Sequence, residues 1–309
     1  MATHDPLAAE GPARRTPGEV LIEVDHLYAG YDGTAILDDV SFNIRAGEVF
    51  GILGGSGGGK STILKHMIGL VPPVSGHVRF AGEDIVGADG EELERLRRRF
   101  GVMYQSGALF GSMTLLENVR LPIEVYSGLP GDAMNLIARM KLALVGLDAF
   151  TGHLPSEISG GMQKRAGIAR AMALDPSILF LDEPSSGLDP ITSATLDATV
   201  RRLAESLGVT FVIVTHDLPS VFASIDRVVL LDKKARGLTA DVKQKVSLGR
   251  GLVRPDVNAI LFDEPLTVID PHLKWMLRSK LKQLHRQFDL TMVYVTHDQT
   301  EALTFADKV

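Results

Sequence analysis

The stretch that decides the fold is Gly54-Gly55-Ser56-Gly57-Gly58-Gly59-Lys60-Ser61-Thr62. An apolar run at 48–53 precedes it and an apolar helical pattern at 63–68 follows it, which predicts the order strand, glycine loop, helix. Its spacing matches G-x-x-x-x-G-K-[ST]. In that pattern, backbone N–H groups of the loop converge on phosphate oxygens and the helix N-terminus adds a positive dipole. We therefore predict that Lys60 binds the β- and γ-phosphates of a nucleotide and that Ser61 binds Mg²⁺.

Composition limits the class of protein. The 309 residues are 45% hydrophobic and 23% charged, which is typical of one or two globular domains. There is no apolar run of 18 residues, so no membrane span is predicted, and zero cysteines exclude disulfides and thiolate metal sites. The net charge of −6 argues against a nucleic-acid partner. Residues 1–17 lack the apolar core of a secretory signal, so we expect a disordered leader there.

The charge is divided unevenly along the chain. Residues 1–232 hold 19 basic and 29 acidic side chains, whereas 233–309 hold 13 basic and 9 acidic ones. This change of sign predicts a domain boundary near Lys233-Lys234, with one domain at 18–232 and a second part at 233–309.

Polar side chains follow three short apolar runs. The run 178–181 leads into Asp182 and Glu183, the pattern of a buried parallel strand that delivers acids at its carboxyl end. We expect Asp182 to hold Mg²⁺ through water and Glu183 to orient the attacking water. The strand predicted at 210–214 ends near His216, a candidate sensor of the γ-phosphate, and the strand at 100–104 ends at Gln105.

A second helix start is suited to an anion. Ser159-Gly160-Gly161 opens a helix that is predicted to run to about Leu174, after a helical insertion at 114–126 and 132–146. Tyr31, beside a turn that joins strands at 19–25 and 34–45, is a candidate for stacking on adenine, although a tyrosine at a hairpin turn is more often a packing residue.

These elements, in this order, resemble the nucleotide-binding subunit of ATP-binding-cassette (ABC) transporters across 19–232. The resemblance rests on Tyr31, the loop 54–62, Gln105, the Ser-Gly-Gly-x-Gln signature and the acids with His216. It implies an α/β fold: a P-loop NTPase core with a mostly parallel sheet, an N-terminal antiparallel β subdomain and a helical subdomain that carries the signature. It also implies ATP and Mg²⁺ as cofactors, with Glu183 as catalytic base, His216 as γ-phosphate switch and Gln105 as Mg²⁺ ligand and link to the membrane subunit. The residues that it assigns to ATP are Tyr31, Gly54, Gly55, Ser56, Gly57, Gly58, Gly59, Lys60, Ser61, Thr62, Ser159, Gly160, Gly161, Gln163 and Asp189.

The resemblance further implies partners and a location. In the family, two copies dimerise head to tail, so that the signature of one copy caps the ATP on the phosphate loop of the other. Integral-membrane permease subunits and, in some systems, accessory subunits complete the assembly. The chain is accordingly expected in the cytoplasm, peripheral on the inner face of the inner membrane.

Within the family, the segments 103–110 and 155–162 look most like the ATPase of Mla-type phospholipid-trafficking systems, which maintain outer-membrane lipid asymmetry. An importer of small polar solutes is the alternative. A soluble ABC protein of translation or DNA repair typically carries two complete cassettes or a long coiled coil, and this chain has neither. A non-hydrolysing regulatory subunit is a further class, although Glu183 and His216 are both in place.

Residues 238–309 resemble 158–228 a second time. The sequences Asp-Glu-Pro, Asp-Pro and Thr-His-Asp recur at a constant offset of 81 residues, beginning at Asp263, Asp270 and Thr296. This copy has no phosphate loop, and its signature position lacks the two glycines. Its sequence resembles that of a sugar- or glycerol-phosphate importer ATPase. A gene fusion or an assembly artefact explains it more simply than a regulatory role. We expect its strands either to join an edge of the first sheet or, less favourably, to displace the strands that they repeat.

Overall fold

In the computed structural model, the described residues are 16, 18–55, 57–105, 107–217, 220, 224–231, 259–263 and 291–295. The chain divides into two compact units, 1–233 and 234–309. The predicted leader, apart from Thr16, lies outside the described residues, and so do Ser56 of the phosphate loop and most of the predicted repeat.

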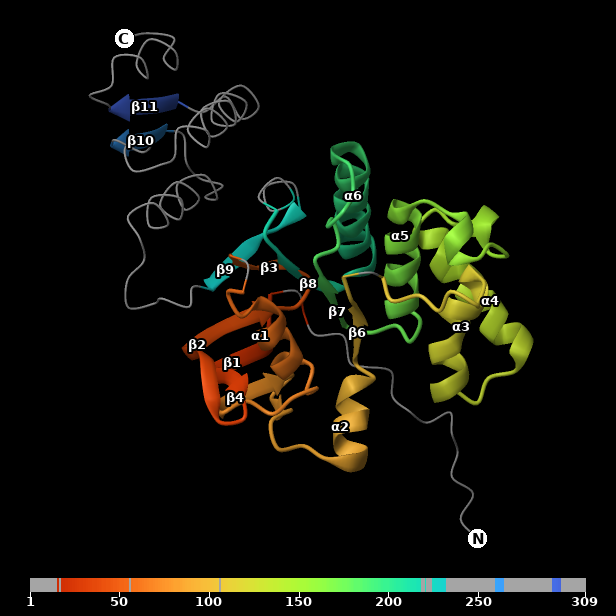
Figure 1. Cartoon of the computed structure of the whole chain (residues 1–309), viewed down its shortest axis with the longest axis horizontal. Coiled ribbons are helices and arrows are strands. Elements are labelled where there is room, and N and C mark those ends of the chain that lie inside the picture. Colours follow the sequence, from red (N-terminus) through yellow and green to blue (C-terminus); the bar gives the residue numbers. More distant parts are fainter. Residues whose placement is uncertain are drawn as a thin grey trace. The chain divides into compact units, whose positions relative to one another are not determined.

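The first unit contains two sheets and six α-helices among its described residues (Figure 1). Its elements, in chain order, are β1 (Val20–Tyr31), β2 (Thr34–Arg45), β3 (Val49–Gly54), α1 (Lys60–Met67), β4 (Ser75–Phe80), β5 (Glu83–Asp84), α2 (Gly90–Arg97), β6 (Phe100–Met103), α3 (Leu115–Tyr126), α4 (Gly131–Leu144), α5 (Gly160–Ala171), β7 (Ile178–Asp182), α6 (Pro190–Leu207), β8 (Thr210–Thr215) and β9 (Arg227–Leu231).

The larger sheet has five parallel strands in the order β6-β7-β8-β3-β9. Strands β3 and β8 are buried at every position, because a parallel sheet covered on both faces needs continuous apolar runs rather than alternation. The expected α/β fold with a mostly parallel sheet is confirmed.

Two cores cover the two faces of this sheet, and the residues of each strand alternate between them. In β7, Ile178 and Phe180 pack into the core that contains α1 and the antiparallel sheet, as the period of two requires. Leu179 and Leu181 pack into the core of α3, α4, α5 and α6. Helices α1 and α5 therefore lie on opposite faces of the five-stranded sheet.

The second sheet is antiparallel, with the order β2-β1-β4-β5, which confirms the expected N-terminal β subdomain. Strand β1 extends to Tyr31, six residues past the predicted end at 25. Asp32 and Gly33 form its turn with φ values of 50° and 76°, the left-handed geometry of a tight hairpin turn.

The helical subdomain follows β6. Helix α3 begins with a capping box, in which Thr114 Oγ1 accepts from the Glu117 backbone N–H and the Glu117 carboxylate accepts from the Thr114 N–H. The basic run 97–99 contributes to packing through two of its side chains. Arg97 donates to the Gly69 carbonyl and Arg99 pairs with Glu83, so these side chains fasten α2 to its surroundings.

In the second unit, β10 (Ala259–Asp263) and β11 (Thr291–Val295) form a parallel two-stranded sheet. Ala259 pairs with Thr291, and Ile178 pairs with Thr210 between β7 and β8. The two pairings have the same register, because both partners are shifted by 81 residues. The repeated sequence thus gives a repeated strand pair, and β7 and β8 keep their own places in the five-stranded sheet. Neither of the two expected outcomes is seen among the described strands: β10 and β11 pair with each other, and they neither join the five-stranded sheet nor displace β7 and β8.

Candidate functional site

Four of the five parallel strands deliver predicted site residues at one edge of the sheet. Strand β3 leads into the glycine loop, β6 into Gln105, β7 into Asp182 and Glu183, and β8 into His216. The register pairs Leu53 with Thr215 and Asp182 with Val214, so these carboxyl ends are aligned. Such an edge is the expected ligand-binding position in an open parallel sheet.

The phosphate loop turns tightly into α1. Gly59 has φ 89°, and a Cβ there would lie 2.7 Å from the side chain of Leu37, so the hairpin of β1 and β2 packs directly on the loop. Lys60 is buried, and its ammonium donates to the carbonyls of Gly54 at 2.9 Å and Gly55 at 3.3 Å. The lysine therefore reaches back across the loop, where a bound phosphate would replace carbonyl oxygens as its partner.

Asp182 fits a Mg²⁺ ligand on its own chemistry. Its Oδ1 atom is buried and has no hydrogen-bond partner among the described residues. Burial, and then the nearby Glu183 carboxylate, raise the pKa of Asp182 above its ordinary range, because both penalise the charged form. A cation is the partner that such a carboxylate lacks. The described residues offer no group of three or more His, Asp or Glu side chains that could hold a metal ion.

Glu183 lies between two cationic or titratable partners. Its carboxylate is 2.9 Å from His216 Nδ1 and 3.6 Å from Lys60 Nζ. The Glu183 side chain is 12% exposed, and its backbone has φ 48°, a strained geometry for a residue other than glycine. This strain aims the side chain off the strand end and into the site.

Tyr31 ends β1 beside α1. Lys65 Nζ lies 5.7 Å from the centre of its ring, and the ring of His66 lies 6.2 Å away with a tilt of 41°. The tyrosine is thus held beside the last turn of the phosphate-loop helix. Its stacking on adenine stays a prediction.

The signature begins α5 on the other face of the sheet. Ser159 is the N-cap, and its Oγ accepts from the Met162 N–H at 3.3 Å. Ser159 and Gly160 are exposed, whereas a Cβ on Gly161 would lie 2.2 Å from Thr192 Cγ2, so this position needs glycine. The exposed N–H groups of the helix start leave room for an anion.

Two predicted ligands have other partners. The Gln163 amide donates to the Pro155 carbonyl at 2.9 Å and so supports the loop before the signature. Asp189 is the N-cap of α6. Its carboxylate accepts from the Thr192 hydroxyl and from the Thr192 and Ile191 N–H groups, and these bonds lower its pKa. Their direct contact with nucleotide stays a prediction.

Lys164 is a residue that the sequence did not single out. It is buried on α5 and donates to the Gln105 carbonyl and, at 3.4 Å, to the Glu183 carbonyl. One side chain thus links the signature helix to two strand ends of the site. Burial lowers the pKa of this lysine. Its place directly after the signature was visible in the sequence, but a lysine there has no pattern of its own.

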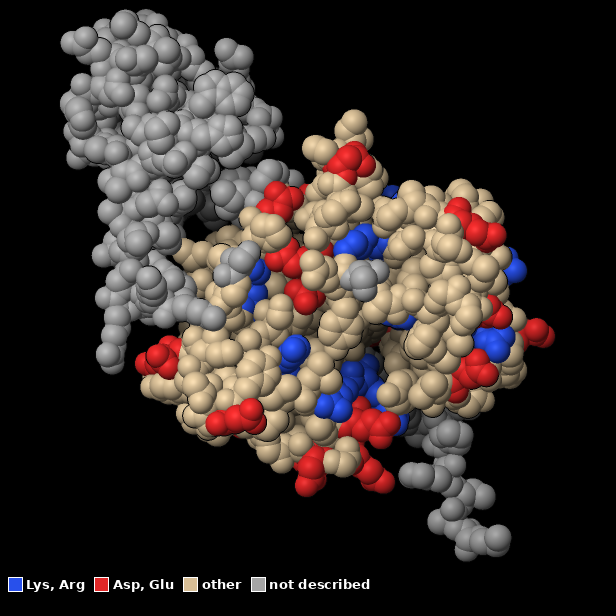
Figure 2. All heavy atoms as spheres, in the orientation of Figure 1, with Lys and Arg blue, Asp and Glu red and all other residues tan. Residues whose placement is uncertain are grey.

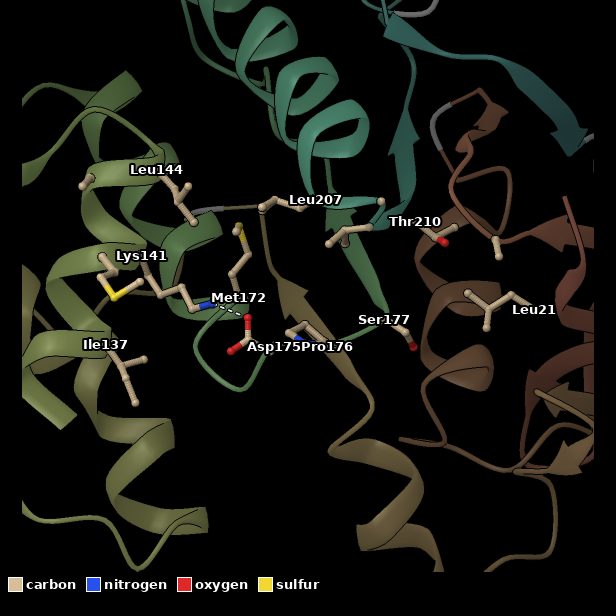
Figure 3. A pocket seen from close by; sticks show the side chains of 15 residues that line it. Leu21, Ile137, Lys141, Leu144, Met172, Asp175, Pro176, Ser177, Leu207 and Thr210 are labelled. Atoms are coloured by element: carbon tan, nitrogen blue, oxygen red, sulfur yellow. Dashed lines mark hydrogen bonds and ion pairs between the residues drawn. The ribbon is translucent and has the colours of Figure 1, made fainter. Parts of the chain in front are cut away.

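Two cavities of similar size accompany these residues. One, of about 620 Å³, is lined by Gln105, Asp182 and Gly160 at the strand ends. The other, of about 600 Å³, lies at the opposite edge of the sheet, where β7 and β8 begin (Figure 3). It is mostly apolar, and Lys141 pairs with Asp175 inside it. None of the predicted site residues lines this second cavity. Lys60, Glu183 and His216 line neither of the two, so the candidate site is placed by the strand ends, and the first cavity adjoins it at Gln105 and Asp182.

The surface gives two general observations. No helix among the described residues is long and apolar enough to span a bilayer. On the face seen in Figure 2, acidic and basic side chains of the described residues are interspersed in small groups without a continuous basic field.

Comparison with known proteins agrees with this site. The family model described as ABC transporter matches residues 37–186. In solved structures, a dimeric post-hydrolysis state of the ATP-binding cassette MJ0796, bound to ADP and Pi, is 32% identical with a TM-score of 0.63 and covers 69% of this chain and 95% of that one. CbiO1 from Clostridium perfringens, part of the ABC transporter complex cbiONQ, is 25% identical with a TM-score of 0.68 and covers 84% and 99%.

Curated relatives carry transport names. The intermembrane phospholipid transport system ATP-binding protein MlaF of Haemophilus influenzae is 38% identical over 74% of this chain and 88% of its own length, and that of Escherichia coli is 40% identical over 64% and 74%. A probable ribonucleotide transport ATP-binding protein, mkl of Mycobacterium leprae, is 43% identical over 69% of this chain, which spans 61% of mkl. The resemblance drawn from the sequence is confirmed, and the chain belongs to the family of ABC transporter ATP-binding proteins.

Proposed function

We propose that this chain hydrolyses ATP and powers an ABC transporter at the membrane. The observation that carries the proposal is the convergence of Lys60, Glu183 and His216 at the ends of three parallel strands. A phosphate-binding lysine, a buried carboxylate and an imidazole within hydrogen-bonding reach of it are the groups that phosphoryl transfer to water requires.

Each group has a role that follows from its position. Lys60 offers positive charge to the β- and γ-phosphates, and the backbone N–H groups of the loop bind their oxygens. Glu183, aimed off the strand end, accepts a hydrogen bond from the attacking water and aligns it with the γ-phosphate. His216 donates to Glu183 or to the γ-phosphate and so reports whether that phosphate is present. Tyr31 stacks on the adenine ring.

Mg²⁺ would be held by Ser61, by Gln105 and, through water, by Asp182. When bound there, the ion would supply positive charge to the phosphate oxygens. The unpartnered Oδ1 atom of Asp182 supports this assignment. Gln105 is exposed, and its amide donates to Ser186 Oγ at 3.3 Å. An exposed side chain can exchange such a contact for another.

Two copies form each site in this proposal. Helix α1 and helix α5 lie on opposite faces of the sheet, so the exposed signature start of one copy suits the phosphate loop of a second. The dimeric structures of MJ0796 support the same assembly. The pair would act in the cytoplasm, on the inner face of the inner membrane, bound to permease subunits and any accessory subunits.

Phospholipid is the cargo that we favour, because two relatives of which this chain covers 74% or more are named for intermembrane phospholipid transport. The mkl relative, named for probable ribonucleotide transport, supports a small polar solute as the second candidate. Purification of the chain from its own membranes, with analysis of the copurified permease and bound phospholipid, separates them. Enrichment of phospholipid over a mock purification supports the first, and a permease without lipid supports the second.

Phosphate release from Mg-ATP by the purified full chain tests the activity. Glu183→Gln should lower the rate by about a hundredfold or more while ATP still binds. Glu205→Gln makes the same change in an exposed carboxylate paired with Arg201 on α6, and should leave the rate unchanged. Hydrolysis at the parental rate by Glu183→Gln would remove Glu183 as the base.

A further inference from the structure

His66 is a buried histidine that the proposed chemistry does not use. It lies on α1, two turns after Lys60, and is 1% exposed. Both ring nitrogens are engaged: Nδ1 is 2.8 Å from the Val71 carbonyl oxygen and Nε2 is 3.1 Å from the Gly30 backbone nitrogen. A carbonyl can only accept and a backbone N–H can only donate. The ring is therefore the neutral tautomer with its hydrogen on Nδ1 and its lone pair on Nε2.

The hydrogen bond from Gly30 to His66 lies at an interruption in the pairing of β1 with β2. The pairing of β1 with β2 passes from Ala29 opposite Leu37 to Gly30 opposite Ala35, so the register skips Ile36. A bulge of this kind interrupts the ladder and turns the strand. A Cβ on Gly30 would lie 1.9 Å from the Thr34 carbonyl oxygen, so the strands approach closely there. His66 gives the Gly30 N–H a buried acceptor from another element.

Tyr31 is the next residue along the strand. The extra residue of the bulge, Ile36, lies on β2 opposite this part of β1, and the Tyr31 ring lies beside the His66 ring and the Lys65 ammonium. Lys65 and His66, two consecutive residues of the phosphate-loop helix, thus lie beside the Tyr31 ring. His66 also binds the N–H of the residue before Tyr31. This couples the base position to the helix that begins at Lys60.

We propose that His66 is a positioning residue for the adenine base: by accepting from Gly30 it fixes the bulge that presents Tyr31. The inference rests on the proposed function, since it needs ATP on the phosphate loop and Tyr31 on its base. Loss of the Nε2 acceptor should let the bulge relax and Tyr31 turn away. Affinity that depends on the base should fall, while affinity that depends on the phosphates alone should stay.

Two substitutions separate the two ring nitrogens. His66→Gln places an amide oxygen near the Nε2 position and keeps an acceptor for Gly30. His66→Asn places its amide near the Nδ1 position, so it keeps a donor for Val71 and loses the acceptor. The probes are ATP, which carries the base, and inorganic tripolyphosphate, which engages the loop without one. Equilibrium dissociation constants are measured for both probes on the full chain.

His66→Asn should weaken ATP about tenfold, the scale of one aromatic–base stack, with tripolyphosphate changed by less than about twofold. His66→Gln should bind both probes within about twofold of the parent. Tyr31→Ala with His66→Asn should bind ATP no more weakly than Tyr31→Ala alone, because the histidine acts through the tyrosine. Equal losses of ATP and tripolyphosphate, parental ATP affinity in His66→Asn, or additive effects in the double variant would each overturn the inference. A parental chain that binds tripolyphosphate but not ATP would overturn the proposed function, and this inference with it.

Discussion

Glu183 and His216 are joined across the ends of neighbouring strands β7 and β8, with 2.9 Å between a carboxylate oxygen and Nδ1. The backbone is joined there too, since the Glu183 N–H donates to the Val214 carbonyl at 2.8 Å. Lys60 approaches the same carboxylate from the phosphate loop. A shift of either strand would therefore change the direction of the proposed base.

His216→Ala should lower the rate of ATP hydrolysis by about a hundredfold and leave the ATP dissociation constant within a few-fold of the parent, because the histidine orients groups rather than anchoring the nucleotide. Steady-state phosphate release and equilibrium binding measure the two quantities. His77→Ala is the matched control, since His77 also pairs with a carboxylate, Asp84, but lies on β4 away from the site. Equal effects of the two substitutions would contradict the role of His216.

Asp182→Asn should raise the free energy of unfolding of the nucleotide-free chain. It should also remove the further stabilisation that Mg²⁺ gives in the presence of ATP. Burial raises the pKa of Asp182, so the folded chain keeps this proton to higher pH than the unfolded chain does. As pH rises above about 4, the unfolded chain loses its proton first and the buried group begins to oppose folding. The variant should gain about 0.5–2 kcal/mol at neutral pH, and the gain should shrink toward acidic pH.

Thermal unfolding of both chains from acidic to neutral pH, with and without Mg-ATP, measures this gain. Asp197→Asn serves as the control, since burial also raises the pKa of Asp197 but the residue accepts from Ser220 Oγ, away from the site. That variant should keep its stabilisation by Mg-ATP. An Asp182→Asn chain that Mg²⁺ still stabilises in the presence of ATP would show that the ligand is a different residue.

Gly161→Ala should cost about 1–3 kcal/mol of stability, because the added methyl group meets Thr192 Cγ2 at 2.2 Å and must push α5 away from α6. Thr192→Ser removes that methyl group and keeps the hydroxyl that bonds Asp189. Chemical denaturation should show that the double variant recovers most of the loss. A double variant no more stable than Gly161→Ala alone would place the strain elsewhere. Gly160→Ala, with its nearest neighbour at 3.7 Å, should cost less.

Mixing two inactive variants should restore hydrolysis if each site is shared between copies. Lys60→Ala removes the phosphate contact and Ser159→Arg blocks the signature. In a mixed dimer, one site would combine the intact Lys60 of one copy with the intact Ser159 of the other. Phosphate release by the mixture should exceed that of either variant alone and should rise with protein concentration. A mixture as inactive as its components would count against the shared site.

The sequence predicted the fold class, which is confirmed, because the fold class depends on local patterns. The same patterns predicted that the candidate site residues lie at strand ends, while their roles stay predictions. Continuous apolar runs indicated buried parallel strands, and polar residues directly after them indicated a common edge. What it missed depends on contacts between distant segments. Arg97 is basic and follows a helical pattern, yet it bonds to Gly69, and no spacing reveals that pair. The two partners of Lys164, and the Gly30 partner of His66, lie 19 to 59 residues away in the sequence.

The strand pair β10–β11 repeats the register of β7–β8 without the glycine loop or the strand that leads into it. The information for this pairing is therefore carried by the two strand sequences and the distance between them. A strand pair of this cassette type can therefore be present in a chain segment that lacks the residues for binding phosphate. Strand pairing and phosphate chemistry are separate properties along one chain, and a search that scores strands alone would count the second unit as a cassette.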